Sequence, residues 1–232
     1  MDYAHPFWLK LRGIGQRTGI LRPLVRLYRK LQRSNYEDNF EIRMMAAITT
    51  GSVVWDVGAN VGFYTEKFVK AVGPAGYVVA FEPAPSAAEL CSIKLADAAN
   101  FRLERKALSN IVGSVEFLAD SAAPTNRILS KSEVVKNAVN VEVLVGDQLL
   151  AADPTIFPNF IKIDVEGYEH EVLEGLQNTL KNPKLTAVFL EMHFLELAKR
   201  GKHSAPREIC ELLRAASLGI QWVDPSHLIA HR

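Results

Sequence analysis

The sequence predicts an α/β fold, with a mostly parallel, doubly wound sheet that carries helices on both faces. From Ser52 onward, short apolar runs typical of strands alternate with helix-like segments, which favours a parallel sheet. Two glycines four residues apart follow the first apolar run, where such folds turn from a strand into a helix. The chain has 232 residues, 48% of them hydrophobic, which is enough for one domain with a packed core.

The first expected element is a basic helical segment within residues 1–48. Apolar residues recur at helical spacing over 7–33, with an interruption near Gly13 to Gly15, and Lys and Arg lie on the opposite face. Residues 1–40 carry eight Lys or Arg and three acids. These helices either pack across the domain or contact an anionic membrane surface or a partner protein. A further helix is expected near 37–48, before the main domain at 49–232.

A glycine turn follows the strand expected at 53–57. Glycine lets the backbone turn sharply and approach a ligand, so Gly58 and Gly62 predict a binding crevice at the end of this strand. Asp56 ends the strand, where it either caps the turn or contacts a bound cofactor. Asn60 tolerates a left-handed backbone, so a structural role and a role in binding both stay open for it.

The second strand, expected at 77–82, ends in Glu82. A carboxylate at this position can accept hydrogen bonds from ribose hydroxyls, so we expect Glu82 to bind a nucleoside. The turn lacks the third glycine of the dinucleotide fingerprint G-x-G-x-x-G, and the chain lacks a P-loop pattern. The crevice is therefore expected to bind a nucleoside cofactor of another kind.

The later elements continue the alternation with one departure. Two β-like runs at 114–118 and 141–145 flank a polar stretch, and they predict an inserted antiparallel pair over about 114–145. Within it, Asn126-Arg127 either reaches over the pocket or stays in solvent. The other strands are expected near 101–105, 160–164 and 185–191, the helices near 63–72, 86–96, 168–180 and 205–217, and a closing hairpin near 220–229.

Charge and composition narrow the function classes. Beyond residue 40 acids outnumber Lys and Arg, so we expect no nucleic-acid partner. Cys91 and Cys210 have no metal-type spacing and are expected to be buried thiols in a reducing compartment. No secretory signal is evident, and no apolar run approaches the ~20 residues of a membrane span. We therefore expect a cytoplasmic protein; its oligomeric state stays open.

Four longer stretches form a more specific combination. D-V-G-A-N-V-G (56–62) and V-G-P-A-G-Y-V-V-A-F-E-P (72–83) resemble the cofactor site of Rossmann-like methyltransferases. I-K-I-D-V-E-G-Y-E-H-E-V-L-E-G-L (161–176) and F-L-E-M-H (189–193) narrow the resemblance to the FkbM family, over about residues 50–195. The resemblance implies a Rossmann-like methyltransferase fold, S-adenosylmethionine as cofactor and methylation mainly of hydroxyl oxygens. It also implies adenine contacts from Ala107 and Leu108, beyond the third strand.

Asp164, Glu191 and His193 follow two strands that we expect to be neighbours, so they are the candidate catalytic residues. Methyl transfer requires an acceptor in line with the sulfonium, and a base helps to remove the hydroxyl proton. Asp164 has the position for a base and for stabilising the sulfonium, whereas His193 has the suitable ordinary pKa. Mg²⁺ held by Asp164 and Glu191 is a rival, but no third ligand is evident, so no metal ligand is assigned. Glu191 and His193 also fit a structural pair, and Glu166 a helix cap.

The sequence therefore predicts an S-adenosylmethionine-dependent O-methyltransferase acting on a hydroxyl of a sugar or polyketide-like metabolite. The alternative is a non-catalytic cofactor-binding or scaffold protein that docks a partner or a membrane through residues 7–33. Release of adenosylhomocysteine with candidate acceptors would separate the two. A nucleic-acid or N-methyltransferase is disfavoured, because the chain lacks an N-P-P-Y/F motif and its body is acidic.

Overall fold

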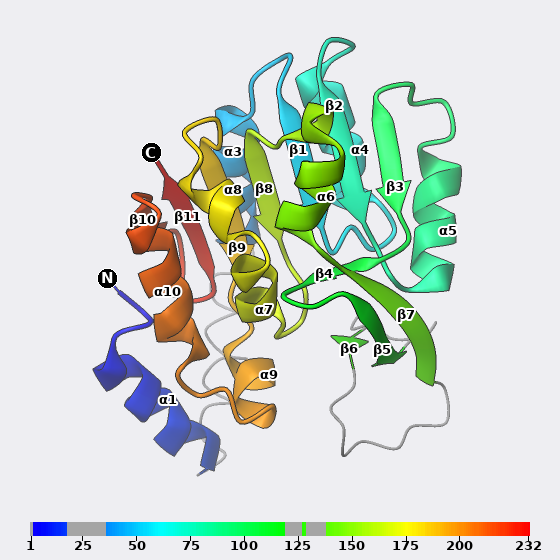
Figure 1. The fold of residues 1–232 in the computed structure, drawn as a ribbon. Helices are drawn as coiled ribbons and strands as arrows, with labels where there is room; N and C mark the ends of the chain where they lie inside the picture. The colour runs from blue at the N-terminus through cyan, green and yellow to red at the C-terminus, as the bar shows by residue number, and fades with distance from the viewer. Residues whose placement is uncertain (1, 18–35, 119–126, 129–137) are drawn as a thin grey trace.

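A seven-stranded sheet forms the centre of the protein (Figure 1). The structure is a computed structural model that describes residues 2–17, 36–118, 127–128 and 138–232. The strand order is β10-β11-β9-β8-β1-β2-β3; the strands from β9 to β3 pair in parallel, and β11 is antiparallel to both of its neighbours. The predicted parallel α/β fold and closing hairpin are thus confirmed. The strands are β1 (Val53–Val57), β2 (Tyr77–Phe81), β3 (Phe101–Glu104), β8 (Phe160–Ile163), β9 (Ala187–Glu191), β10 (Gly219–Trp222) and β11 (His227–His231).

Helices cover both faces of this sheet. Successive side chains of a strand point to opposite faces, and in the central strands the side chains on both faces are apolar, so both faces must be covered. On one face Val54 and Phe189 pack with residues of α3 and α4, whereas on the other Trp55 and Leu190 pack with residues of α7, α8 and α10. The helices are α1 (Pro6–Arg17), α3 (Tyr36–Ala47), α4 (Phe63–Val72), α5 (Pro85–Lys94), α6 (Gly146–Ala152), α7 (Glu169–Glu174), α8 (Gln177–Lys181), α9 (Phe194–Lys199) and α10 (Ala205–Ala215).

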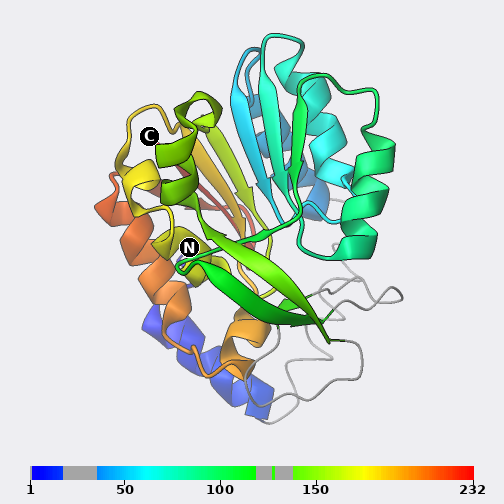
Figure 2. The same ribbon diagram turned by 45° about the vertical axis from the view of Figure 1, so that its right-hand side comes forward.

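The inserted region forms a second sheet beyond the end of β3 (Figure 2). The expected antiparallel pair is present, since β5 (Gly113–Leu118) pairs with β7 (Ala138–Val145). The sheet has the order β4-β7-β5-β6, with β6 at Arg127–Ile128. Residues 107–109, which no strand was expected to include, form strand β4 (Ala107–Ser109), parallel to β7. All three β4 side chains are buried, so packing rather than local pattern sets this strand.

Two helix expectations need correction. The single helix expected at 168–180 is divided into α7 and α8, with Gly175 between them. A Cβ atom at Gly175 would lie 2.1 Å from the carbonyl oxygen of Ser109, so the chain passes β4 at a distance that only glycine permits. In the N-terminal segment, α1 continues through Gly13 and Gly15 to Arg17 instead of being interrupted there.

The N-terminal helix α1 is attached to the domain at several points. Tyr3 packs edge-to-face on Trp222 with ring centroids 5.5 Å apart. Arg12 lies 3.8 Å from the ring centroid of Phe194 and donates a hydrogen bond of 2.8 Å to the carbonyl of Pro225. The described part of the basic segment therefore packs across the domain. Residues 18–35, which carry most of its Arg and Lys, lie outside the described residues, as does Asn126.

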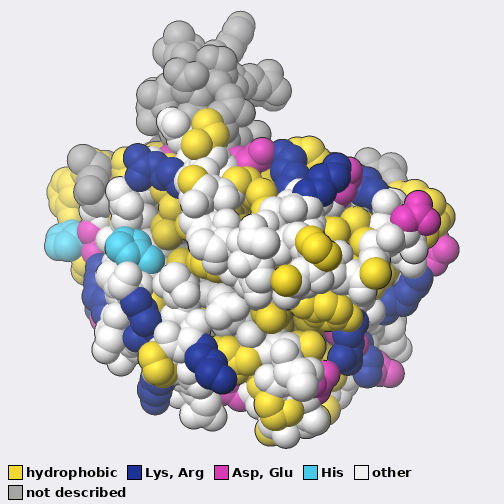
Figure 3. Space-filling view, turned by 90° about the horizontal axis from the view of Figure 1, so that it is seen from above, with side chains coloured by type: hydrophobic (Ala, Val, Ile, Leu, Met, Phe, Trp, Pro, Cys, Tyr) yellow, Lys and Arg dark blue, Asp and Glu magenta, His cyan; other side chains and the backbone are white. Residues whose placement is uncertain are grey.

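Surface charge and cysteine burial can be compared with the sequence expectations. On the face shown in Figure 3, Lys and Arg side chains of the described residues are interspersed with acidic, apolar and uncharged atoms. Cys91 and Cys210 are free and buried, as expected, and burial raises their pKa to about 11 and about 12. Among the described helices, none combines the length and the hydrophobicity that a bilayer crossing requires.

Candidate active site

The predicted crevice lies where the parallel strands β2, β1, β8 and β9 end. Register places Val57 beside both Phe81 and Ile163, and Ile163 beside Leu190. The carboxyl ends of these four strands therefore meet at one edge, which is where α/β sheets bind ligands. Asp56, Glu82, Asp164 and Glu191 come from these strand ends, and the structure brings all four to this edge.

The glycine turn is held close to both neighbouring strands. Gly58 has φ +84°, and a Cβ atom there would lie 1.9 Å from the carbonyl oxygen of Asp164. Gly62 has φ +77°, and a Cβ atom there would lie 2.8 Å from Sγ of Cys91 on α5. Asn60 has the expected left-handed backbone, with φ 49°. Both glycines are thus required by contacts within the protein, a reason that adds to the expected approach of a ligand.

Glu82 is buried and connects the end of β2 to the glycine turn. Its carboxylate accepts hydrogen bonds of 2.8 Å from the backbone N–H groups of Asn60 and Ala84. Burial raises the pKa of Glu82, and the two backbone hydrogen bonds oppose this shift. An ionised carboxylate has about four acceptor positions, so about two remain for further donors.

Asp56 lies beneath the turn, fully buried. It accepts a hydrogen bond of 2.7 Å from the hydroxyl of Thr65 in α4 and lies 3.1 Å from Nζ of Lys162. Nζ of Lys162 also donates a hydrogen bond of 2.8 Å to the carbonyl oxygen of Gly58. The buried pair of Asp56 and Lys162 therefore supports the glycine turn. Burial lowers the pKa of Lys162, but the charges of Asp56 and Asp164 more than offset this and raise it overall. Lys162 is thus a buried cation paired with a buried acid.

Ala107 and Leu108, the expected adenine contacts, lie on strand β4. Both side chains are buried, and that of Leu108 belongs to the core cluster around β1 and β8. Their position depends on the second sheet, because β4 pairs with β7, and an adenine contact stays a prediction.

His193 lies at the centre of a group of carboxylates. Its Nδ1 is 2.7 Å from Oε1 of Glu169, while its Nε2 is 3.7 Å from Asp164 and 3.8 Å from Glu191. Glu166 lies 3.5 Å from the same Nε2 and has a left-handed backbone, with φ 50°. We call these five residues the acid–histidine cluster. The three expected catalytic residues, Asp164, Glu191 and His193, are indeed neighbours.

Burial and charge shift several pKa values in this cluster. Burial lowers the pKa of His193, but its hydrogen bond to Glu169 and the surrounding carboxylates raise it to about 10. Burial raises the pKa of Glu166 to about 7. Burial would also raise the pKa of Glu191, yet the hydrogen bond and charge of His227 lower it to about 2. The surrounding carboxylates stabilise the protonated ring and so disfavour His193 as a neutral imidazole base, whereas a cation bound at Nε2 would compete with that proton.

Two residues of this region were not found from the sequence. Glu169 is fully buried and orients His193, and its only sequence signal is its place in the E-G-Y-E-H-E run. His227, directly opposite Glu191 in the β9–β11 pairing, lies 3.4 Å from that carboxylate. Its Nδ1 is 2.7 Å from Asp224. The sequence predicted the closing hairpin but not that its second strand, β11, pairs with β9.

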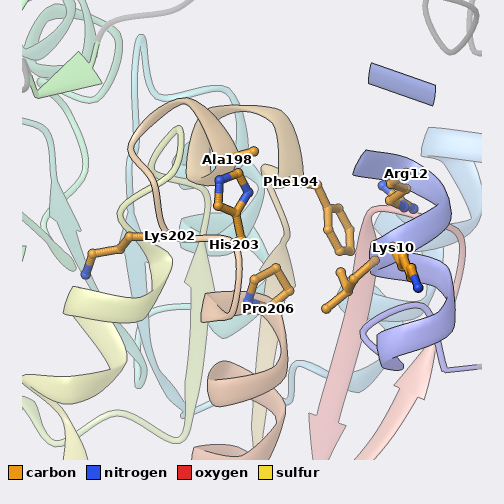
Figure 4. A pocket seen from close by; sticks show the side chains of 8 residues that line it. Lys10, Arg12, Phe194, Ala198, Lys202, His203 and Pro206 are labelled. Atoms are coloured by element: carbon orange, nitrogen blue, oxygen red, sulfur yellow. The ribbon is translucent and has the colours of Figure 1, made fainter. Parts of the chain in front are cut away.

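A pocket of about 220 Å³ lies beside this edge, between α1, α9 and the start of α10 (Figure 4). Its apolar surface comes from Leu9, Phe194, Ala198 and Pro206, and Lys10, Arg12, Lys202 and His203 line it as well. Phe194 directly follows His193, so the pocket and the acid–histidine cluster are contiguous in the chain.

Fold and site together define a class: an α/β protein in which one edge of the parallel sheet carries a glycine turn, a buried strand-end carboxylate and an acid–histidine cluster. Residues 56–218 match the family model described as the Methyltransferase FkbM domain, so the chain belongs to this family.

Individual relatives are more distant. The hexuronic acid methyltransferase AglP of Haloferax volcanii is 27% identical over 170 residues, which cover 73% of this chain and 64% of AglP. The chain thus spans just under two thirds of that relative. The solved FkbM methyltransferase of Methylobacillus flagellatus KT has 13% identity and a TM-score of 0.54, covering 79% of this chain and 44% of that one. The cofactor-bound structure of Rv0187 from MTB has 14% sequence identity and a TM-score of 0.51. The match covers 85% of this chain and 80% of Rv0187. These structures share the fold.

Proposed function

We propose that this protein transfers a methyl group from S-adenosylmethionine to a hydroxyl oxygen of a sugar. The main structural support for this proposal is the contact between the glycine turn and the end of β8, where a Cβ atom at Gly58 would overlap the carbonyl of Asp164. A cofactor bound at the turn and Glu82 would therefore place its sulfonium near Asp164. Family membership supports the reaction, and the name of the Haloferax volcanii relative supports a sugar rather than a polyketide-like acceptor.

In the proposed reaction, separate residues bind the cofactor, accept the proton and hold the acceptor. Glu82 binds the ribose hydroxyls, and Asp164 stabilises the cationic sulfonium from the adjacent strand end. The acceptor oxygen attacks the methyl carbon in line with the carbon–sulfur bond, which breaks and leaves its electron pair on sulfur. The hydroxyl proton passes to Asp164, which is half-buried and open to solvent on one side. Glu191 and His193 hold the acceptor beside it.

Three further expectations stay predictions. Adenine is expected near β4. A cytoplasmic location is expected from the sequence, and a membrane or partner contact through residues 7–33 concerns mainly residues outside the described part. Nothing observed favours the non-catalytic scaffold alternative over the enzyme.

Release of adenosylhomocysteine tests the proposal. The full chain is incubated with S-adenosylmethionine and separate acceptors: a neutral hexose glycoside, a hexuronic acid glycoside and a hydroxylated polyketide-like compound. We expect acceptor-dependent release with a sugar, and its loss in Asp164→Asn. Glu89→Gln, an exposed carboxylate on α5, is the matched control and should keep full activity. Cofactor binding without release on any acceptor would support the scaffold alternative instead.

A further inference from the structure

We propose that Asp164, Glu191 and His193 form a binding site for a divalent first-row transition-metal ion. Among the described residues these three offer ligand atoms that all lie within 4.8 Å of one another. The sequence suggested two carboxylates at most; the structure adds an imidazole nitrogen as a third donor. The inference concerns the same site as the proposed function, but metal binding itself does not depend on that function.

The donor distances are close to those of a metal site. Nε2 of His193 lies 3.7 Å from Oδ1 of Asp164 and 3.8 Å from Oε1 of Glu191. Metal–ligand bonds of about 2.0–2.2 Å would place neighbouring donors about 3 Å apart. The two pairs that include His193 would therefore need to close by less than about 1 Å, and the Asp164–Glu191 pair, whose donors lie within 4.8 Å of each other, by less than about 2 Å. Because all three are partly exposed, the remaining coordination positions face solvent, as in catalytic metal sites.

His193 is oriented as metal-bound histidines are. Its Nδ1 lies 2.7 Å from Oε1 of Glu169, so Nε2 is directed at Asp164 and Glu191. Metal-bound histidines almost always donate their second ring N–H to a carboxylate or carbonyl in this way. Glu169 is fully buried, and its second oxygen, Oε2, has no hydrogen-bond partner among the described residues. A buried, incompletely satisfied carboxylate is costly and is explained if it fixes a ligand.

Glu191 is supported in a comparable manner. Its Oε2 lies 3.4 Å from Nε2 of His227, and Nδ1 of His227 lies 2.7 Å from Asp224. This leaves Oε1, the oxygen on the His193 side, for a ligand. Two of the three proposed ligands are thus each held by a chain of further side chains, which is typical of metal centres.

Charge and donor type indicate which ion fits. The acid–histidine cluster contains four carboxylates around one imidazole. Lys162, 3.5 Å from Asp164, and His227, 3.4 Å from Glu191, offset part of this negative charge, and a divalent cation would balance more of it. Mg²⁺ prefers oxygen ligands, whereas an imidazole suits transition ions. The mixed set of two carboxylates and one histidine therefore favours an ion such as Mn²⁺, Fe²⁺ or Zn²⁺ over Mg²⁺. An ion there would bind the acceptor hydroxyl and lower its pKa.

Mn²⁺ titration followed by electron paramagnetic resonance tests the site in the full, chelator-treated chain. We expect saturable binding of one Mn²⁺, abolished in Asp164→Asn and Glu191→Gln. Glu169→Gln, which alters only the orienting carboxylate, should weaken affinity by roughly 10- to 100-fold. Glu211→Gln, an exposed carboxylate on α10, is the matched control and should bind like wild type. Urea unfolding of each variant identifies any that fail to fold.

The outcomes separate this inference from the proposed function. Absence of saturable Mn²⁺ binding in the wild type, or equal affinity in folded Glu191→Gln, would overturn the metal site. Calorimetry with S-adenosylmethionine on the same samples addresses the cofactor alone. Cofactor binding without Mn²⁺ binding would reject only the metal site, whereas Mn²⁺ binding without cofactor binding would reject only the proposed function.

Discussion

Replacing Gly58 with alanine should disturb both halves of the site at once. The added Cβ would lie 1.9 Å from the carbonyl oxygen of Asp164, whereas real Cβ atoms essentially never approach within 3.0 Å of such an atom. Either the glycine turn or the end of β8 must therefore move by more than about 1 Å. Backbone atoms on both sides make this contact, so no side-chain rotation relieves it.

The same chain offers a control with matched backbone strain. Gly51 also has φ +84°, but a Cβ there would meet nothing within 4 Å. Alanine in this left-handed conformation costs about 1–2 kcal/mol, which both variants should lose. The overlap in Gly58→Ala should lower the free energy of unfolding by about 1–3 kcal/mol more, which is the loss that overpacking of a core causes. Displacement of the turn should also weaken cofactor affinity, because the backbone that faces the cofactor moves with it.

Urea unfolding measures the two free energies of unfolding, and calorimetric titration measures affinity for S-adenosylmethionine. We expect Gly51→Ala to retain wild-type affinity. Equal stability and equal affinity in the two variants would refute the reasoning, because backbone strain alone would then explain Gly58. Normal affinity in a destabilised Gly58→Ala would show that the turn does not touch the cofactor.

Three other substitutions test separate contacts. Glu82→Gln should weaken S-adenosylmethionine binding roughly 10- to 100-fold, since a hydrogen bond to a charged group contributes about 1.5–3 kcal/mol; unchanged affinity in calorimetry would remove Glu82 from the cofactor site. Lys162→Met should lower the free energy of unfolding by about 3–5 kcal/mol, because it leaves Asp56 buried without its partner, and wild-type stability in urea would contradict this. Arg12→Ala should expose α1 to limited proteolysis, because the contacts with Phe194 and Pro225 are lost; an unchanged cleavage rate would mean that other contacts hold this helix.

Local patterns were sufficient for the central sheet. Four of the five parallel strands are short, mainly apolar runs, whereas β3 alternates apolar and charged residues. The strand ends at Asp56, Glu82 and Asp164 were recognisable because a polar residue or a glycine turn marks each of them. Strand β4 was missed because three residues carry no periodicity, and only their burial against β7 and α7 defines them. The break at Gly175 was missed for a similar reason, since it depends on a distant carbonyl.

The site was predictable to the extent that parallel topology determines it. Asp164, Glu191 and His193 follow neighbouring strands, so strand order alone brings them together. The orienting residues could not be found in this way. Glu169 reaches His193 through a turn whose direction is set by Gly167, at φ +95°, and His227 arrives on an antiparallel strand. The raised pKa of His193 depends on these neighbours, so its ordinary value was misleading.

The antiparallel position of β11 constrains which changes in chain length the site can tolerate. Asp224 accepts hydrogen bonds from the backbone N–H groups of Ser226 and His227, which fixes the hairpin turn, and the pairing then places His227 opposite Glu191. A strand displaced by one residue presents its side chains to the opposite face of the sheet. One residue inserted between 224 and 226 would therefore bring Ser226 opposite Glu191 and turn the imidazole of His227 away. Insertions between α10 and β10, on the outer edge, leave this pairing unchanged, so length variation that preserves activity belongs there.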